Sequence, residues 1–209
     1  MRRWLTPPSD DVVIVIDSHP GDFIPNYVFV MDSRGHAIVA QGESRVVVSG
    51  TSALTARGRS RVDVRDEAVV QATDFAQVNW HDSSSGKCGY YARGQVFDTA
   101  TVEMHALCPL FAFDSSTVAA HGGSHVLAYD NASVTAHHQA VVEIWDDVDV
   151  TAYDWAVVYS EGGEVYAHDH VAVYAKYDTR VEGPATSVVH VLTPGVRVVG
   201  DITVIDGEQ

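Results

Sequence analysis

Apolar and small side chains alternate with polar ones along most of this chain, in a unit of eight residues that repeats from Ala40 to Ser160. Each unit reads small, x, Asp or Gly, x, Ala or Ser, x, Val, x, and residues 128–135 show it most clearly. Alternation with a period of two is typical of β-strands, whose successive side chains point to opposite faces. The pattern therefore predicts short strands separated by tight turns, with the even-numbered residues of this region facing inward.

Aspartates spaced sixteen residues apart indicate how much chain makes one coil. The series consists of Asp66, Asp82, Asp98, Asp114, Asp130 and Asp146. Because the intervening units carry mixed residues at the same position, one coil should contain two units. The inward Ala, Ser and Val residues are too small for a wide sandwich core and favour two strand layers lying close together. We therefore predict an all-β, single narrow β-solenoid with 16-residue coils, eight or so in number and stacked over roughly 40 Å.

Two segments of different character flank the repeats. We assign residues 1–39 to an N-terminal cap or docking segment, residues 40–183 to the solenoid and residues 184–209 to C-terminal cap strands. Repeat proteins need atypical end units because an uncovered coil exposes apolar core and unpaired strand edges. Capped ends are therefore part of the prediction. Near Gly162 and Gly163 the pattern gains one residue before it resumes.

The composition supports strands and limits the functions to consider. Valine occurs 36 times, leucine six times and lysine twice, which favours strands over helices. The formal charge of −15 argues against direct binding of nucleic acid. No apolar run is long enough to predict a membrane span, and no secretory signal is recognisable. We therefore expect no membrane or nucleic-acid partner and a cytoplasmic or virion location.

The unit at residues 128–135, followed by Ala136, resembles the repeat of bacterial ice-nucleation proteins, which are solenoids with two octads per coil. Residues 40–160 are also similar to degenerate repeats of uncharacterised bacterial and phage proteins. The resemblance implies the fold and suggests either an ice- or water-organising surface or a part of a phage particle. Ice-nucleation proteins present a long Thr-x-Thr row, which only Thr99 and Thr101 match strictly here. The alternative ice-binding face consists of Thr99, Thr101, Ser115, Thr117 and Ser133.

The stacked aspartates allow two interpretations. A Ca²⁺ ladder would neutralise them, but calcium needs six to eight oxygen ligands and few other carboxylates lie nearby in the pattern. Alternatively, each Asp lies at a coil corner and accepts hydrogen bonds from backbone N–H groups of the turn. Because Gly replaces Asp in other units, we favour a structural Asp ladder without metal.

Histidines form an outward column at the same spacing, namely His105, His121 and His137. Imidazoles about 5 Å apart could bind Zn²⁺ or act as a protonation switch near pH 6. No fixed third ligand is evident, so we favour a surface role, and metal binding stays an open alternative.

A second outward column carries large rings. Its members are His81, Phe97, Phe113, Tyr129 and Trp145. Stacking between coils alone would account for them, at roughly 0.2–1 kcal/mol per pair. A row of large rings on an outer face is also typical of a contact surface. We therefore take Phe97, Phe113, Tyr129 and Trp145 as the candidate interaction surface.

Residues 80–95 depart most from the repeat. Trp80 and Tyr90 occupy inward positions for small residues, while Gly86 and Gly94 replace inward valines. Large residues beside glycines indicate that volume is conserved locally, because cores tolerate such exchanges. A ligand pocket here is the alternative.

Signals for catalysis are weak. The chain has no Gly-x-Ser-x-Gly elbow, no phosphate-binding glycine loop and no His-Glu-x-x-His motif. Cys88 and Cys108 both face inward in different columns, and we expect buried thiols there. We predict a protein that is not an enzyme and has no cofactor.

Charge is distributed unevenly, with Arg57, Arg59, Arg61 and Arg65 clustered and no Lys or Arg in residues 98–175. Such polarity suits assembly with a basic partner or between copies. We therefore expect a non-catalytic structural or protein-interaction module that belongs to a larger assembly, with a protein partner or self-association. The alternatives are an ice- or water-organising surface and an acidic DNA-mimic inhibitor.

Overall fold

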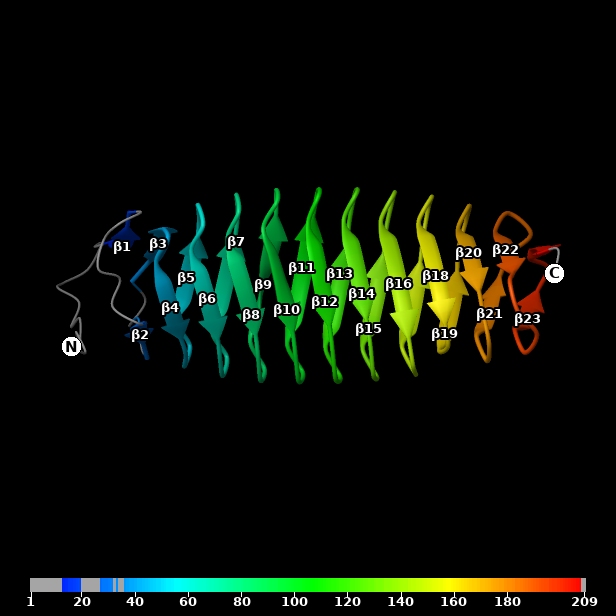
Figure 1. The fold of residues 1–209 in the computed structure, drawn as a ribbon, viewed down its shortest axis with the longest axis horizontal. Coiled ribbons are helices and arrows are strands. Elements are labelled where there is room, and N and C mark those ends of the chain that lie inside the picture. Colours follow the sequence, from blue (N-terminus) through cyan, green and yellow to red (C-terminus); the bar gives the residue numbers. More distant parts are fainter. Residues whose placement is uncertain (1–12, 20–26, 32, 34–35, 208–209) are drawn as a thin grey trace.

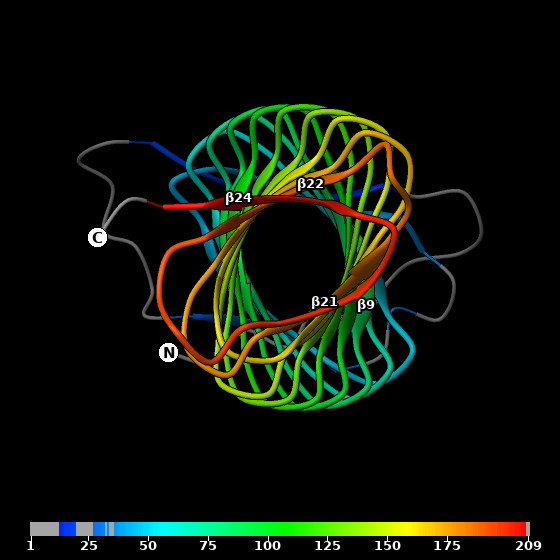
Figure 2. The ribbon, with the colours of Figure 1, turned by 90° about the vertical axis from the view of Figure 1, so that its right-hand side faces the viewer.

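The computed structural model describes residues 13–19, 27–31, 33 and 36–207, and these residues wind into a β-solenoid without any helix (Figure 1). The strands stack along the axis of a rod, and the end-on view shows each coil rotated slightly against the one before (Figure 2). No helix in the described residues is long and apolar enough to cross a membrane. The prediction of an all-β solenoid is confirmed.

The odd-numbered strands form one parallel sheet of 12 strands in sequence order. They are β1 (Ile14–Ser18), β3 (Ile38–Gly42), β5 (Ala53–Ala56), β7 (Val69–Ala72), β9 (Ser85–Gly89), β11 (Thr101–His105), β13 (Thr117–Ala120), β15 (Ser133–Ala136), β17 (Asp149–Ala152), β19 (Glu164–Ala167), β21 (Arg180–Gly183) and β23 (Arg197–Gly200). We call this sheet A.

The even-numbered strands form the second parallel sheet, also of 12 strands, which we call sheet B. They are β2 (Val28–Val30), β4 (Arg45–Val48), β6 (Arg61–Val64), β8 (Gln77–Trp80), β10 (Arg93–Val96), β12 (Pro109–Ala112), β14 (His125–Ala128), β16 (Val141–Trp145), β18 (Val157–Glu161), β20 (Ala172–Ala175), β22 (Val188–Val191) and β24 (Thr203–Asp206). A first corner leads from each odd strand to the next even one, and a second corner leads from each even strand to the next odd one.

The coil length is sixteen residues through most of the rod. Thr101 pairs with Thr117, and Thr117 pairs with Ser133. The solenoid makes about 11 turns, more than the predicted eight, because strands in both flanking segments also join the sheets. At about 4.8 Å per coil, the rod is about 50 Å long. Within residues 1–39, for which a cap or docking role is predicted, residues 1–12, 20–26, 32 and 34–35 lie outside the described residues.

The coil that contains Gly162 and Gly163 is a residue shorter than the sixteen-residue coils that precede it, so the prediction of a gained residue near Gly162 was wrong. Trp145 pairs with Glu161 sixteen residues later, but Asp149 pairs with Glu164 only fifteen residues later. The shortened corner brings backbone close to the coil below: a Cβ at Gly163 would lie 2.2 Å from the Val148 carbonyl oxygen. Gly163 also has a φ of 73°, which favours glycine.

The core is a narrow column of Val and Ala residues between the two sheets. Val118, Ala120, Val134 and Ala136 are buried in successive strands of sheet A, while the odd-numbered residues between them face outward. The alternation within the strands is therefore as predicted. Small side chains suffice because the two sheets lie close together, and the close packing excludes water from the interior.

The corner aspartates lie outside the core, although the alternation placed them on the inward side. Asp98 and Asp114 are exposed, with φ angles of 56° and 57°. A left-handed residue turns the chain, which breaks the alternation, and Asp, Asn and Gly tolerate this conformation best. The Asp114 carboxylate accepts a 3.2 Å hydrogen bond from the backbone N–H of Asp98 in the preceding coil.

The same bond recurs along the second corner. The N–H groups of Gly50, Asp66, Asp82, Asp98 and Asp114 donate to the carboxylates of Asp66, Asp82, Asp98, Asp114 and Asp130, respectively. At the first corner Asp74 and Asp154 accept from Gly58 and His138 in the same way. Each carboxylate thus ties its own corner to the previous one.

Trp80 is fully buried between two glycines, one in β9 of sheet A and one in β10 of sheet B. A Cβ at Gly86 would lie 2.6 Å from the indole Nε1, and one at Gly94 would lie 2.7 Å from Cζ3. The indole therefore occupies the space that valines fill in other coils. Tyr90 was expected inside but is 68% exposed, because it takes the left-handed corner position with a φ of 54°.

Cys88 and Cys108 form a disulfide, so the expectation of buried thiols was wrong. Cys88 ends the inward series of β9, and Cys108 precedes β12 one coil later. The first corner folds these two columns toward each other, with 6.6 Å between the Cα atoms. The bond therefore links neighbouring coils inside the rod.

The corner bond predicts a graded response at position 114. Asp114→Ala removes the carboxylate acceptor and leaves a residue that disfavours a positive φ at the corner. We therefore expect the unfolding free energy to fall by about 2 kcal/mol or more. Asp114→Asn keeps the acceptor and tolerates the conformation, so its loss should be about 1 kcal/mol or less. Asp114→Gly relieves the backbone but removes the acceptor and should fall between them. Guanidinium chloride unfolding measures all three, and equal losses for Ala and Asn would contradict the role of the carboxylate.

The packing around Trp80 predicts coupling between two positions. Gly86→Ala should cost about 1–3 kcal/mol, because the new methyl group meets both the indole and the Val70 carbonyl oxygen. In a Trp80→Val background the indole contact is absent, so the cost should be smaller by at least about 0.5 kcal/mol. A double-mutant cycle from denaturant unfolding tests this. Additive losses would show that the backbone contact alone excludes the methyl group.

Candidate functional site

The predicted interaction surface forms a continuous stack of rings along the second corner. Ring centroids from Phe97 to Phe113, Tyr129 and Trp145 are 5.1, 5.2 and 4.8 Å apart, with interplanar angles of 10° or less. His81 extends the stack at 4.8 Å from Phe97. Each ring covers the faces of its neighbours, so all of these side chains are only half-exposed. The structure brings the predicted residues together but leaves mainly ring edges at the surface.

A more exposed apolar column, which the sequence analysis missed, follows the first corner. Phe75, Tyr91, Leu107 and Trp155 are 61%, 57%, 58% and 64% exposed, and we call them the exposed ridge. Phe75 and Tyr91 stack at 5.8 Å, and Trp155 stacks on His170 at 4.6 Å. The sixteen-residue step joins Phe75, Tyr91 and Leu107, and it reaches Trp155 after Gly123 and Gln139. This series was the signal that could have revealed the column.

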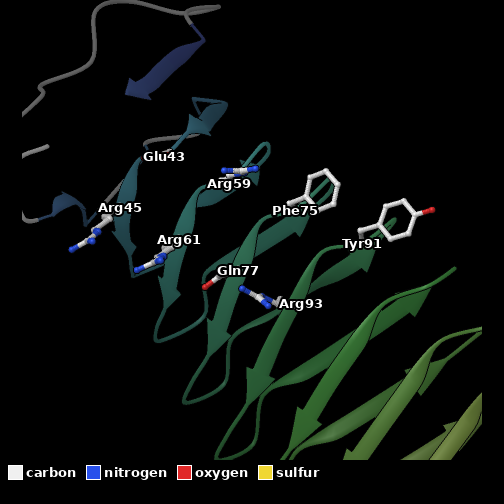
Figure 3. Close-up of a pocket in the computed structure, with 8 residues that line it drawn as sticks. All are labelled: Glu43, Arg45, Arg59, Arg61, Phe75, Gln77, Tyr91 and Arg93. Carbon is white, nitrogen blue, oxygen red and sulfur yellow. The ribbon is translucent and has the colours of Figure 1, made fainter. Parts of the chain in front are cut away.

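A hollow of about 480 Å³ lies beside the N-terminal end of this ridge (Figure 3). Its lining consists of Glu43, Arg45, Arg59, Arg61, Phe75, Gln77, Tyr91 and Arg93, and we call it the arginine hollow. Arg45, Arg61, Gln77 and Arg93 begin successive strands of sheet B and are register partners. Arg59, Phe75 and Tyr91 come from the corners that lead into these strands.

The hollow gathers positive charge, because four arginines and one carboxylate, Glu43, line it. Arg45, Arg59, Arg61 and Arg93 form no ion pair or side-chain hydrogen bond with any described residue. By contrast, Lys176 pairs with Glu161 at 2.7 Å, and Arg180 pairs with Glu164 and Glu182. Unpaired guanidinium groups can bind carboxylate or phosphate in a bidentate manner. With Phe75 and Tyr91 beside them, the arginines can therefore hold an anionic surface that also carries apolar groups.

The histidine column is longer than predicted. His105, His121, His137, Tyr153 and His168 stack in order, with centroids 5.3, 4.9, 4.8 and 4.7 Å apart. The sequence analysis missed Tyr153, which keeps the sixteen-residue step but is not a histidine, and it missed His168 because the fifteen-residue coil shifts the count. In this stack the imidazoles face one another instead of converging on one point. No group of three or more His, Cys, Asp or Glu residues within the described ranges could hold a metal ion.

Two groups near the start of the histidine column have altered pKa values. Burial lowers the pKa of His121, and the neighbouring charges of His137 and His105 act in the same direction. The hydrogen bond from Lys87, at 2.6 Å, holds the pKa of Glu103 below its usual range. His105 also donates to Glu103 at 2.8 Å. The column is thus anchored by one carboxylate at its N-terminal end.

The candidate ice-binding hydroxyls do not share one flat face. Thr101, Thr117 and Ser133 begin neighbouring strands of sheet A and lie in register. Thr99 and Ser115 lie in the second corner instead, and Thr99 Oγ1 donates to the Asp82 carbonyl oxygen at 2.9 Å. The hydroxyls are therefore divided between a sheet and an edge.

Comparison of the chain with protein-family models, curated proteins and solved structures found no match. The functional argument therefore rests on the surfaces described above. These are the exposed ridge, the arginine hollow and the carboxylates of the Asp ladder.

The lowered pKa of His121 predicts a pH-dependent stability. As pH falls, the unfolded chain binds a proton at this position near the ordinary pKa of 6.5, before the folded protein does. The corresponding part of the unfolding free energy is present above that pH and is lost as pH falls toward the folded pKa. His121→Gln should therefore reduce the loss of stability between pH 7.5 and pH 5.5 in denaturant unfolding. His36→Gln, far from the column, is the control, and an unchanged loss in His121→Gln would contradict the assignment.

Proposed function

We propose that this protein is a non-catalytic structural and protein-interaction module that forms part of a larger assembly. The observation that carries the proposal is the exposed ridge, where Phe75, Tyr91 and Trp155 expose more than half of their surface on a regular rod. Large exposed apolar side chains on soluble proteins commonly mark contact surfaces, and aromatic residues and Arg are enriched there. The ridge and the arginine hollow adjoin, so both features occur on one surface.

The Asp, His and Cys side chains that could carry chemistry form contacts within the rod, which also supports a structural role. The ladder aspartates from Asp66 to Asp130 accept backbone hydrogen bonds, and the central histidines stack on one another. Cys88 and Cys108 are joined in a disulfide. These groups link neighbouring coils to one another, and such links suit a rigid spacer or docking rod. Membership of a phage particle is part of the proposal and rests on the resemblance of the repeat.

The proposal predicts that the ridge is needed for contacts with other proteins. The triple variant Phe75→Ser, Tyr91→Ser and Trp155→Ser changes only exposed positions, so it should unfold at nearly the same denaturant concentration as the unmodified chain. We expect light scattering to show assembly of the unmodified chain, or the immobilised chain to retain specific proteins from an extract, and we expect the triple variant to lose either effect.

A matched control replaces Val69, which is 43% exposed on β7, with Ser. This variant should behave like the unmodified chain. A chain that stays monomeric at every concentration and retains the same proteins as the triple variant would contradict the proposed function. Droplet-freezing activity that depends on Thr101 and Thr117 would instead support the ice-organising alternative.

A further inference from the structure

Two rows of opposite charge run along the rod, one on sheet B and one on the second corner. The arginine row consists of Arg45, Arg61 and Arg93 on sheet B, with Arg59 beside it at the first corner. The Asp ladder follows the second corner, and its members are exposed. Neither row has an ion-pair partner within the part of the chain that the structure describes. Each row is therefore free to pair with an opposite row on another molecule.

The ladder carboxylates are held in place without being neutralised. From Asp66 to Asp130, the Oδ2 atom accepts a backbone N–H of the preceding coil, which leaves Oδ1 available. Residues 98–175, which include most of the ladder, contain no Lys or Arg. A fixed carboxylate loses little conformational entropy on binding, so the ladder is preorganised for cations.

The two rows have the same repeat distance because the coil sets both. Register partners on neighbouring parallel strands lie about 4.8 Å apart, and corner residues repeat with the same rise. When two rods lie side by side with a stagger of about three coils, Asp98, Asp114 and Asp146 of one can face Arg45, Arg61 and Arg93 of the other. Gln77 then faces Asp130. The phosphates of a nucleic-acid strand repeat at a different distance from the coils. Such a strand, laid along the arginine row, would also continue past Arg93 onto residues 98–175, which contain no Lys or Arg.

Apolar groups next to the two rows are also complementary. Phe75 and Tyr91 border the arginine row, and the stacked rings of Phe97 and Phe113 directly precede the ladder residues Asp98 and Asp114. Ring edges on both corners can therefore pack while guanidinium and carboxylate groups pair beside them. Contact between charged pairs next to apolar groups excludes water and strengthens the pairing.

We propose that the arginine hollow binds the Asp ladder of a second copy of this chain. This inference rests on the proposed function of a protein-interaction module. It adds that one partner is a second copy of the chain and that guanidinium and carboxylate groups form the contact. The two surfaces differ, so the contact is heterologous and every copy keeps one free hollow and one free ladder. Copies therefore add side by side into an open row instead of closing as a dimer.

Analytical ultracentrifugation of the full chain at several concentrations tests this. In 0.15 M NaCl we expect a mass that rises with concentration beyond the 22.6 kDa monomer. In 1 M NaCl, where the screening length is about 3 Å, we expect monomer. Arg45→Glu with Arg61→Glu should weaken association at least tenfold, whereas Arg197→Glu on β23 makes the same kind of charge change elsewhere and should not.

A complementation experiment distinguishes this contact from other modes of association. Asp98→Asn with Asp114→Asn keeps the corner acceptors but removes two charges, so this variant retains a hollow and loses the ladder. The variant with Arg45→Glu and Arg61→Glu retains the ladder and loses the hollow. Each variant alone should be monomeric, and their mixture should form a 1:1 heterodimer of about twice the monomer mass that grows no further.

Several outcomes would overturn the inference. Association that survives the arginine variant but disappears in the triple ridge variant would overturn the charge pairing and leave the proposed function standing. An unmodified chain that is monomeric in 0.15 M NaCl would overturn the inference alone, because retention of other proteins by the ridge is measured separately. Arginine-dependent binding of a fluorescent 15-nucleotide oligo-dT by a chain that does not self-associate would assign the hollow to nucleic acid instead.

Discussion

Parallel backbone pairing between successive coils places Thr117 beside Thr101 and Ser133 beside Thr117, and parallel pairing continues along both sheets. Because backbone hydrogen bonds set the rise at about 4.8 Å, side chains that recur at the coil length must stack. The ring column, the histidine column and the Asp ladder are all products of this spacing. The pairing holds only while the corners stay tight, and left-handed Asp and Gly residues make them so. Surface chemistry therefore depends on a backbone constraint.

The regular part of the fold could be predicted because a strict repeat permits few geometries. Alternation fixed which strand residues are buried, and Asp66 to Asp146 at sixteen-residue steps indicated the coil length. The stacking of Phe97, Phe113, Tyr129 and Trp145 followed from the same count. In each case one number, the coil length, converts sequence position into spatial position.

The features that sequence reasoning missed lie where the count or the alternation breaks. A left-handed corner residue reverses the chain direction, so Asp98 and Tyr90 lie outside although their parity placed them inside. Loss of one residue after Glu161 moves His168 into the histidine column. The disulfide between Cys88 and Cys108 needs two columns that meet only because the corner bends them together.

The candidate site was difficult to predict for a related reason. The sequence shows a cluster from Arg57 to Arg65, but the hollow takes only Arg59 and Arg61 from that cluster. Arg45 and Arg93 come from coils above and below, and Phe75 and Tyr91 come from a neighbouring column. Periodicity in the sequence shows which residues stack within one column, but it does not show which columns lie side by side. The hollow becomes apparent only when the arginine column of sheet B is placed beside the column of Phe75 and Tyr91 at the corner.

The corner bonds point in one direction along the chain, since each carboxylate reaches back to an amide of the coil before it. A coil leaving the ribosome therefore lacks the acceptor for its own corner amide until the following sixteen residues have emerged. Repeat proteins fold by propagation from neighbour to neighbour. In this chain every newly synthesised coil supplies the carboxylate acceptors for the corner amides of the coil already formed.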